Sequence, residues 1–123
     1  DAVDAQRPNL FNSVLVNRYA TGSAGIKWHS DAEKCYGASS EITIASLSLG
    51  APRKFMLRRK AGGRSAGAAL VLRPGSLLVM GGTMQERWQH ALEADPAEGG
   101  CRINLTFRWC KEPRVVGRAM RPS

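Results

Sequence analysis

Residues that bind metals or crosslink small folds are scarce in this sequence, which has two histidines and three cysteines among 123 residues. The cysteines, Cys35, Cys101 and Cys110, are odd in number and form no closely spaced Cys-x-x-Cys pair, which argues against a zinc ribbon or a disulfide framework. Cys101 and Cys110 are expected on one strand, too far apart for a disulfide bond. We therefore predict reduced thiols and an intracellular protein, of the nucleus or the cytoplasm.

Long hydrophobic runs are also missing. No segment approaches the roughly 20 apolar residues of a membrane-spanning helix, and no secretory signal pattern is present, so we expect no membrane association. A chain of 123 residues with 43% hydrophobic content fits one small globular domain with a modest core. Because the chain starts at Asp1 without a methionine, we expect a fragment or a processed form.

Acidic residues are few compared with basic ones. Ten Asp and Glu against 18 Lys and Arg give a formal net charge of +8 and a pI near 10.1. This balance favours a polyanionic partner, most simply nucleic acid. The alternative is that the charge serves only solubility.

Short β-rich runs separated by Gly, Pro and Asn turns predict an all-β fold, a sandwich or jelly-roll barrel with little helix. One helical turn is expected at Met84–Arg87, and residues 41–49 and 53–60 are expected to form a hairpin across Gly50-Ala51-Pro52. Residues 1–10 are predicted as a tail, 11–110 as the core and 111–123 as a basic tail that frays. Besides a short strand before His29, strands are expected at 11–19, 41–49, 53–60, 68–73, 76–80, 88–93 and 102–110.

A histidine and a carboxylate lie two residues apart in Trp28-His29-Ser30-Asp31. On an extended backbone, residues at i and i+2 point to the same face, so His29 and Asp31 converge. With His90, the only other histidine, they can form the facial triad of non-haem Fe(II) oxygenases. The alternative is that His29 and Asp31 are an ordinary solvated pair.

The run 102–110 alternates polar and apolar side chains. Arg102, Asn104, Thr106 and Arg108 share one face of the expected strand. This pattern is equally typical of an edge strand with its polar face in water and of a pocket wall with two arginines aimed at a dianion.

These motifs together resemble the catalytic core of the AlkB family of 2-oxoglutarate/Fe(II)-dependent dioxygenases. The resemblance runs in family order from about Phe11 to Arg108, and Trp-His-Ser-Asp is similar to the eukaryotic members that prefer single strands. It implies a double-stranded β-helix, or jelly-roll, core that lacks the family's N-terminal nucleotide-recognition lid. The matching segments are Asn17-Arg18-Tyr19, Trp28-His29-Ser30-Asp31-Ala32-Glu33, Ala45-Ser46-Leu47-Ser48-Leu49-Gly50, Pro74-Gly75-Ser76-Leu77-Leu78, Trp88-Gln89-His90 and Arg102-Ile103-Asn104-Leu105-Thr106-Phe107-Arg108.

The resemblance also implies a role for each matching position. Arg102 matches the arginine that pairs with the far carboxylate of 2-oxoglutarate, and Arg108 the arginine near the carboxylate that chelates iron. Glu33 matches a carboxylate that accepts a hydrogen bond from the exocyclic amine of the methylated base. The matches to the iron ligands are His29, Asp31 and His90, and those to further residues that hydrogen-bond the cosubstrate are Asn17, Tyr19 and Asn104.

The implied reaction uses Fe(II), O₂ and 2-oxoglutarate to remove methyl groups from N1-methyladenine or N3-methylcytosine in single-stranded DNA or RNA. It releases succinate, CO₂ and formaldehyde, and the enzyme is expected to be a monomer. Three alternatives stay open: an AlkB-type oxygenase acting on another RNA or a protein, a non-catalytic nucleic-acid-binding jelly roll, and a cupin-type structural or storage protein. The last leaves Arg102 and Arg108 unexplained.

Charge placement adds an expectation about the strand preference. A basic cluster on the expected hairpin can track a phosphate backbone or form a solvated face. Members of the resembled family that grip duplex DNA have basic residues in the loop between His90 and Arg102, whereas this loop is acidic, so the resemblance implies a preference for single strands. Trp28 and Trp88 flank the metal ligands and are expected to pack rather than to stack on bases. The basic cluster is Arg53, Lys54, Arg58, Arg59, Lys60 and Arg64, and the acidic loop residues are Glu93, Asp95 and Glu98.

Overall fold

The computed structural model describes residues 10–61, 67–112 and 115–122, and strands dominate them. The elements are β1 (Ser13–Tyr19), β2 (Ile26–His29), η1 (Lys34–Tyr36), β3 (Ile44–Gly50), β4 (Arg53–Arg59), β5 (Ala68–Leu72), β6 (Leu77–Met80), α2 (Met84–Arg87), β7 (Trp88–Leu92), β8 (Arg102–Arg108) and β9 (Val115–Met120). The predicted helical turn at Met84–Arg87 is confirmed. In the described part of the chain, no helix is long and apolar enough to cross a membrane.

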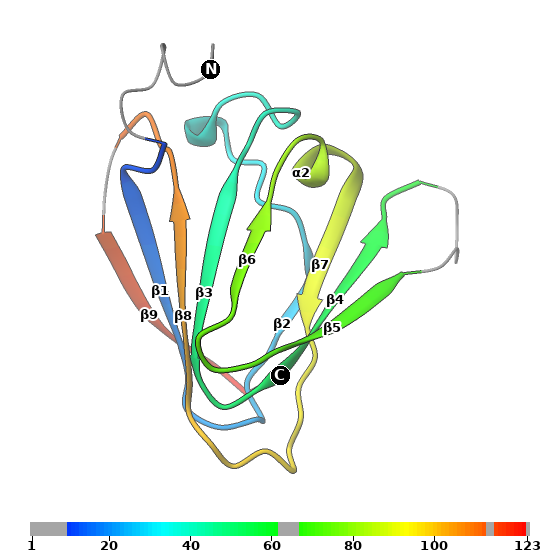
Figure 1. Ribbon diagram of the computed structural model, residues 1–123, viewed down its shortest axis with the longest axis vertical. Helices are drawn as coiled ribbons and strands as arrows, with labels where there is room; N and C mark the ends of the chain where they lie inside the picture. Colours follow the sequence, from blue (N-terminus) through cyan, green and yellow to red (C-terminus); the bar gives the residue numbers. More distant parts are fainter. Residues whose placement is uncertain (1–9, 62–66, 113–114, 123) are drawn as a thin grey trace.

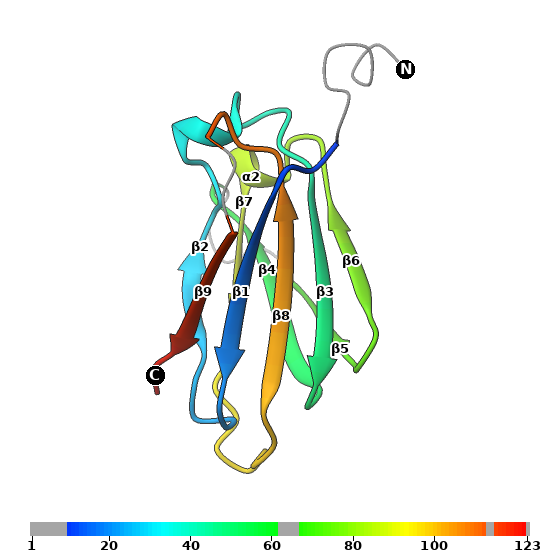
Figure 2. The same cartoon turned by 90° about the vertical axis from the view of Figure 1, so that its left-hand side faces the viewer.

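Two sheets face each other, as expected for a jelly roll (Figure 1). The larger sheet has five strands in the order β6-β3-β8-β1-β9, and the smaller has four in the order β2-β7-β4-β5. Figure 2 shows the larger sheet from outside, with β8 between β1 and β3. The predicted all-β jelly-roll class is confirmed.

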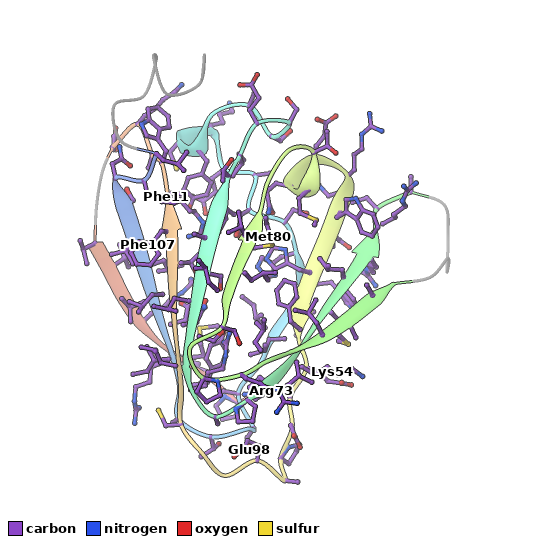
Figure 3. All side chains as sticks on the ribbon, in the orientation of Figure 1. Phe11, Lys54, Arg73, Met80, Glu98 and Phe107 are labelled. Carbon is purple, nitrogen blue, oxygen red and sulfur yellow. The ribbon has the colours of Figure 1, made fainter. Side chains whose placement is uncertain are left out.

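Alternation along the strands sends one set of side chains between the sheets. The core includes Ile44, Phe55, Leu72, Met80 and Leu92, and Met80 lies between the sheets in Figure 3. Phe11 and Phe107 instead lie on the outer side of the larger sheet, with ring centroids 6.4 Å apart. The apolar core fills only part of the interior, because polar residues of the larger sheet also point inward.

The predicted hairpin of residues 41–49 and 53–60 is wrong. β3 pairs with β6 and β8, whereas β4 pairs with β5 and β7 in the opposite sheet. The connection Gly50-Ala51-Pro52 therefore carries the chain from one sheet to the other. Gly50 has a φ of +81°, and a Cβ there would lie 2.3 Å from the Cys101 carbonyl oxygen, so the crossing requires glycine.

The predicted fraying of residues 111–123 is also wrong for Val115–Met120, which form β9, a strand parallel to β1. Unpaired backbone groups at the edge of β1 provide the partners for this strand. Residues 1–9 of the predicted N-terminal tail lie outside the described residues.

Candidate functional site

The two histidines lie directly opposite each other on neighbouring strands of the smaller sheet. His29 ends β2 and pairs with His90 of β7, after a register shift between Ile26 and His29. Their ring centroids are 4.2 Å apart and their planes are inclined by 60°. The shift lets both Ile26 and His29 face the interior, where both line the main cavity.

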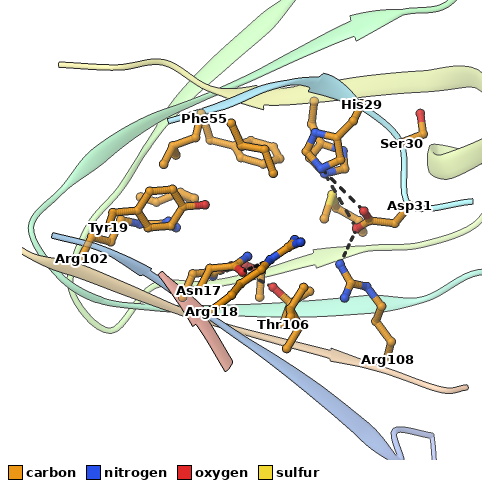
Figure 4. A pocket seen from close by; sticks show the side chains of 18 of the residues that line it. Asn17, Tyr19, His29, Ser30, Asp31, Phe55, Arg102, Thr106, Arg108 and Arg118 are labelled. Carbon is orange, nitrogen blue, oxygen red and sulfur yellow. Dashed lines mark hydrogen bonds and ion pairs between the residues drawn. The ribbon is translucent and has the colours of Figure 1, made fainter. Parts of the chain in front are cut away.

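Asp31, two residues beyond β2, completes the predicted triad (Figure 4). Its carboxylate oxygens lie 3.6 Å from His29 Nε2 and 3.9 Å from His90 Nε2. One ligand atom from each residue fits within 4.8 Å of the other two. Metal–ligand bonds of about 2.1 Å at right angles place donor atoms about 3 Å apart, so a small contraction would close this set around one ion.

Hydrogen bonds orient these ligands. His29 Nδ1 lies 2.7 Å from the Lys27 carbonyl oxygen, an acceptor, so Nδ1 carries the proton and Nε2 presents its lone pair. Arg108 Nη2 donates to Asp31 Oδ2 at 2.8 Å, which leaves Oδ1 free for a metal ion. Two histidines and one carboxylate leave open coordination positions, which fits a catalytic iron site better than a closed structural one.

The charge states of Asp31 and His90 also suit metal binding. Burial raises the pKa of the Asp31 carboxyl, but Arg108 and both histidines outweigh burial, and the net pKa is below the ordinary value. Burial, with the nearby His29 and Arg108, lowers the pKa of His90 to about 4, although Asp31 opposes this shift. At neutral pH the site therefore offers an ionised carboxylate and an unprotonated His90.

The polar face of β8 forms the wall opposite the triad. Arg102, Asn104, Thr106 and Arg108 are all at least nine-tenths buried. β8 is a central strand and its polar side chains line a cavity, so the edge-strand interpretation is wrong, and the dianion that the pocket-wall interpretation expects stays a prediction. A cavity of about 190 Å³ reaches from these side chains to the triad and is lined by Asn17 and Tyr19 as well.

Arg102 and Tyr19 occupy the end of the cavity away from the triad (Figure 4). Arg102 Nη2 donates to Ser48 Oγ at 2.9 Å, and its guanidinium lies 5.1 Å from the centre of the Tyr19 ring. Arg102 Nε is buried without a hydrogen-bond partner among the described residues. A buried guanidinium with unmatched donors is suited to a carboxylate ligand. Burial raises the pKa of the Tyr19 phenol despite nearby arginines, so Tyr19 stays a hydrogen-bond donor.

Asn17 and Asn104 form the floor between these two ends. Asn104 Nδ2 donates to Ser46 Oγ at 2.6 Å, and Asn104 Oδ1 accepts from Thr106 Oγ1 at 2.8 Å. Asn17 Oδ1 accepts from Arg118 Nε at 2.9 Å. The structure thus brings together every predicted metal and cosubstrate residue around one cavity.

Glu33 is exposed at the rim, on the loop that carries Asp31. Besides the main cavity it lines a neighbouring cavity of about 170 Å³, together with Tyr36 and Arg108. The Arg108 guanidinium lies 5.2 Å from the centre of the Tyr36 ring. Glu33 therefore lies at the exposed edge of the cavity that contains the triad.

Two contributors were not predicted from the sequence. Gln85 of α2 is fully buried, and its Oε1 accepts from the Asp31 backbone N–H at 2.8 Å. Arg118 comes from β9 and lines both cavities. Gln85 lies in a short helical turn without a recognisable motif, and Arg118 lies in a segment predicted to fray. The sequence around these two residues therefore did not indicate a role in the site.

The predicted basic cluster holds only in part. Arg53 is 2% exposed and donates inward to the carbonyl oxygens of Ala24 and Glu93. The prediction that Arg53 belongs to the basic cluster is therefore wrong. It cannot meet a phosphate because its side chain is packed between the sheets. Arg64 lies outside the described residues.

The exposed arginines of β4 contact the two tryptophans beside the metal ligands. The Arg58 guanidinium lies 4.3 Å from the centre of the Trp28 ring, and that of Arg59 lies 5.2 Å from the Trp88 ring. Both tryptophans are half-buried, which agrees with the predicted packing role. Each arginine keeps its guanidinium exposed while its position is held by a ring.

Comparison with known proteins agrees with this geometry. DNA oxidative demethylase ALKBH2 of Arabidopsis thaliana is 39% identical over 119 residues, covering 80% of this chain and 37% of that protein. Human alpha-ketoglutarate-dependent dioxygenase alkB homolog 3 is 35% identical over 113 residues, covering 86% and 39%. Human DNA oxidative demethylase ALKBH2 is 39% identical over 114 residues, covering 88% and 43%.

The chain spans about two fifths of the length of these curated relatives. The family model described as the 2OG-Fe(II) oxygenase superfamily matches residues 2–108, which include the triad and the whole polar face of β8. Its cofactors, Fe(II) and 2-oxoglutarate, are those that the His-Asp-His group and the buried arginines fit. The chain therefore belongs to the 2OG-Fe(II) oxygenase superfamily, as a catalytic core of the AlkB type.

Proposed function

We propose that this chain is the catalytic core of an enzyme that removes N-linked methyl groups from nucleic-acid bases by oxidation. The observation that carries the proposal is the single cavity that joins His29, Asp31 and His90 to the buried Arg102. A metal triad alone fits many sites, and a buried arginine alone fits many anions. Their combination fits a dianion held at one end by arginine and at the other by iron.

Each residue has a defined task in this proposal. His29, Asp31 and His90 hold Fe(II), while Arg108 fixes Asp31 through Oδ2 and lies near the carboxylate that chelates iron. Arg102 pairs with the far carboxylate of 2-oxoglutarate. The remaining cosubstrate hydrogen bonds come from Tyr19, Asn17 and Asn104.

The chemistry that bound iron supplies is O₂ activation coupled to oxidative decarboxylation of 2-oxoglutarate, which yields succinate, CO₂ and a hydroxylated N-methyl group. The N–CH₂OH product then loses formaldehyde and restores the base. The protein's own part is to orient the reactants and exclude water from the cavity. Glu33 would accept a hydrogen bond from the exocyclic amine and hold the base at the rim.

Single-stranded DNA or RNA carrying N1-methyladenine or N3-methylcytosine is the proposed substrate class. The methyl groups of both bases lie on the pairing edge, so the base must be unpaired to react. A net charge of +8 and exposed Arg58 and Arg59 favour a nucleic-acid backbone. The acidic loop residues Glu93 and Asp95 are exposed, which disfavours the second strand of a duplex.

Location and assembly are part of the proposal. A reducing compartment such as the nucleus or the cytoplasm is proposed, because Cys101 and Cys110 are not joined in a disulfide in the described part of the chain. A monomer is proposed, and light scattering of the purified chain would test that assignment.

The decisive experiment measures succinate and formaldehyde together. The chain is incubated with Fe(II), 2-oxoglutarate and a single-stranded oligonucleotide carrying N1-methyladenine, beside a His29→Ala control. Both products, lost in the control, are expected. Succinate without formaldehyde would show an oxygenase with a different substrate, such as another RNA or a protein. A folded chain that makes neither product would be a non-catalytic binding module.

A further inference from the structure

One row of polar side chains crosses four strands of the larger sheet at the floor of the cavity. Ser48 of β3 pairs with Asn104 of β8, Asn104 with Asn17 of β1, and Asn17 with Arg118 of β9. Residues in register on adjacent strands point to the same face of a sheet, so all four point between the sheets, and Asn104, Asn17 and Arg118 line the cavity. β9, the edge strand beside β1 in Figure 2, thus extends the row of proposed cosubstrate residues by one cation.

Arg118 sets the orientation of the Asn17 side chain. Its Nε donates to Asn17 Oδ1 at 2.9 Å, which occupies the acceptor of that amide. The Asn17 Nδ2 donors then remain for a ligand with acceptor oxygens. In Figure 4 the Arg118 guanidinium reaches over Asn17 and Thr106 into the cavity, instead of pointing away from the sheet.

Arginines outnumber carboxylates around the cavity, so Arg118 is available to pair with an anionic ligand. The lining contains three arginines, Arg102, Arg108 and Arg118, and two carboxylates, Asp31 and Glu33. Asp31 is already paired with Arg108 at 2.8 Å. Arg118 is close enough to Tyr19 that its positive charge acts to lower the pKa of that phenol. Its field therefore extends to the far end of the cavity, where Arg102 lies.

We propose that Arg118 is a further cosubstrate-binding residue, which orients the Asn17 amide toward 2-oxoglutarate and adds a third cation to its site. The inference rests on the proposed function, because it takes the ligand of this cavity to be 2-oxoglutarate. It assigns a task to β9: the strand supplies part of the binding site. One charge-assisted hydrogen-bond arrangement is worth about a tenfold change in affinity.

The chain offers a matched control. Arg18 of β1 and Arg118 of β9 lie on adjacent strands, but Arg18 is one position beyond Asn17 and therefore points to the outer face. Arg18→Gln and Arg118→Gln remove the same charge from nearly the same place in the molecule. Only Arg118→Gln removes it from the cavity.

The test measures binding of Mn(II) and then of 2-oxoglutarate by calorimetry, because Mn(II) occupies the triad without supporting turnover. Arg118→Gln is expected to bind Mn(II) like the unmodified chain and 2-oxoglutarate about tenfold more weakly. Arg18→Gln is expected to match the unmodified chain in both titrations. Arg118→Lys keeps the charge and is expected to recover part of the affinity.

Three outcomes would contradict the inference in distinguishable ways. Equal 2-oxoglutarate affinity in Arg118→Gln and Arg18→Gln would overturn it and leave the proposed function intact. Parallel loss of Mn(II) and 2-oxoglutarate binding in Arg118→Gln would show that Arg118 only supports the fold. An unmodified chain that binds Mn(II) but no 2-oxoglutarate would overturn the proposed function and this inference with it.

Discussion

Gln85 joins the loop of the metal ligand Asp31 to the helical turn α2. It is 0% exposed, its Oε1 accepts from the Asp31 N–H, and its Nε2 lies 3.8 Å from Met80 Sδ. The Gln85 carbonyl oxygen also accepts from Lys60 Nζ at 3.0 Å. Without the Oε1 acceptor, the Asp31 N–H would lack a partner, which costs about 1–3 kcal/mol for a buried group.

Replacing Gln85 by Leu should loosen the metal site. Replacing a residue that hydrogen-bonds a metal ligand typically lowers metal affinity by about tenfold or more. Gln85→Leu is therefore expected to bind Mn(II) at least about tenfold more weakly. Gln85→Glu keeps an accepting oxygen and should recover much of the affinity. Gln89→Leu, on the opposite face of the neighbouring strand, serves as the control. Unchanged Mn(II) affinity in Gln85→Leu by calorimetry would remove Gln85 from the positioning of Asp31.

The lowered pKa of His90 predicts how the stability of the metal-free protein changes in acid. Its pKa in the folded state is about 4, below the ordinary value of 6.5, because burial disfavours the charged ring. Between these values the unfolded chain binds a proton that the folded chain does not, so the free energy of unfolding falls as the pH falls. The full effect is about 3 kcal/mol at most.

The measurement is the unfolding midpoint in chelator-treated samples across this pH window. The unmodified chain should lose stability steadily from about pH 6.5 down to about pH 4. His90→Gln, which has no titrating ring, should show a flatter profile over the same window. Two parallel profiles would mean that another group causes the acid sensitivity.

Strand β4 carries the charges expected to meet a nucleic-acid backbone. Arg58 and Arg59 at its end are exposed and lie over Trp28 and Trp88, which flank the metal ligands in sequence. Lys54, near the other end, is paired with Glu93 at 3.6 Å. The strand therefore presents free positive charge only at the end near the triad.

Replacing Arg58 and Arg59 together by Ala should weaken binding to single-stranded oligonucleotides. Each phosphate contact contributes about 0.7 to the slope of log affinity against log salt for single strands, so losing two should lower that slope by about 1.4. Fluorescence anisotropy over a salt series measures it. Lys54→Ala is expected to keep the original slope, and an unchanged slope in the double variant would exclude this end of β4 from the contact surface.

At the level of the whole molecule, the site exists only where the two sheets meet. The smaller sheet supplies His29 and His90, the larger sheet supplies the arginines of β8, and Asp31 connects them through Arg108. The larger sheet also has an apolar outer face, on which Leu77 is 63% and Val79 59% exposed. Along β8 its inner face is polar, which reverses the usual arrangement for a strand with one solvated side.

Local patterns were enough for the strands other than β9 and for the chemistry of the site. A period of two residues places Arg102, Asn104, Thr106 and Arg108 on one face whatever the strand pairs with. The two histidines are the only ones in the chain, so a His-Asp-His site had no alternative histidines, and the His-x-Asp spacing selected Asp31. The sequence could not tell whether the polar face of β8 meets water or a ligand, because that depends on its neighbours.

The errors and omissions concern contacts between distant segments. The Gly50-Ala51-Pro52 connection suits a hairpin and a crossing between sheets equally well, and the pairing of β3 with both β6 and β8 excludes the hairpin. Arg118 meets Asn17 across 101 positions of sequence, and Gln85 meets Asp31 across 54. Strand order and register bring such residues together, and these are settled by burial and backbone pairing over the whole chain, which no local pattern of residues encodes.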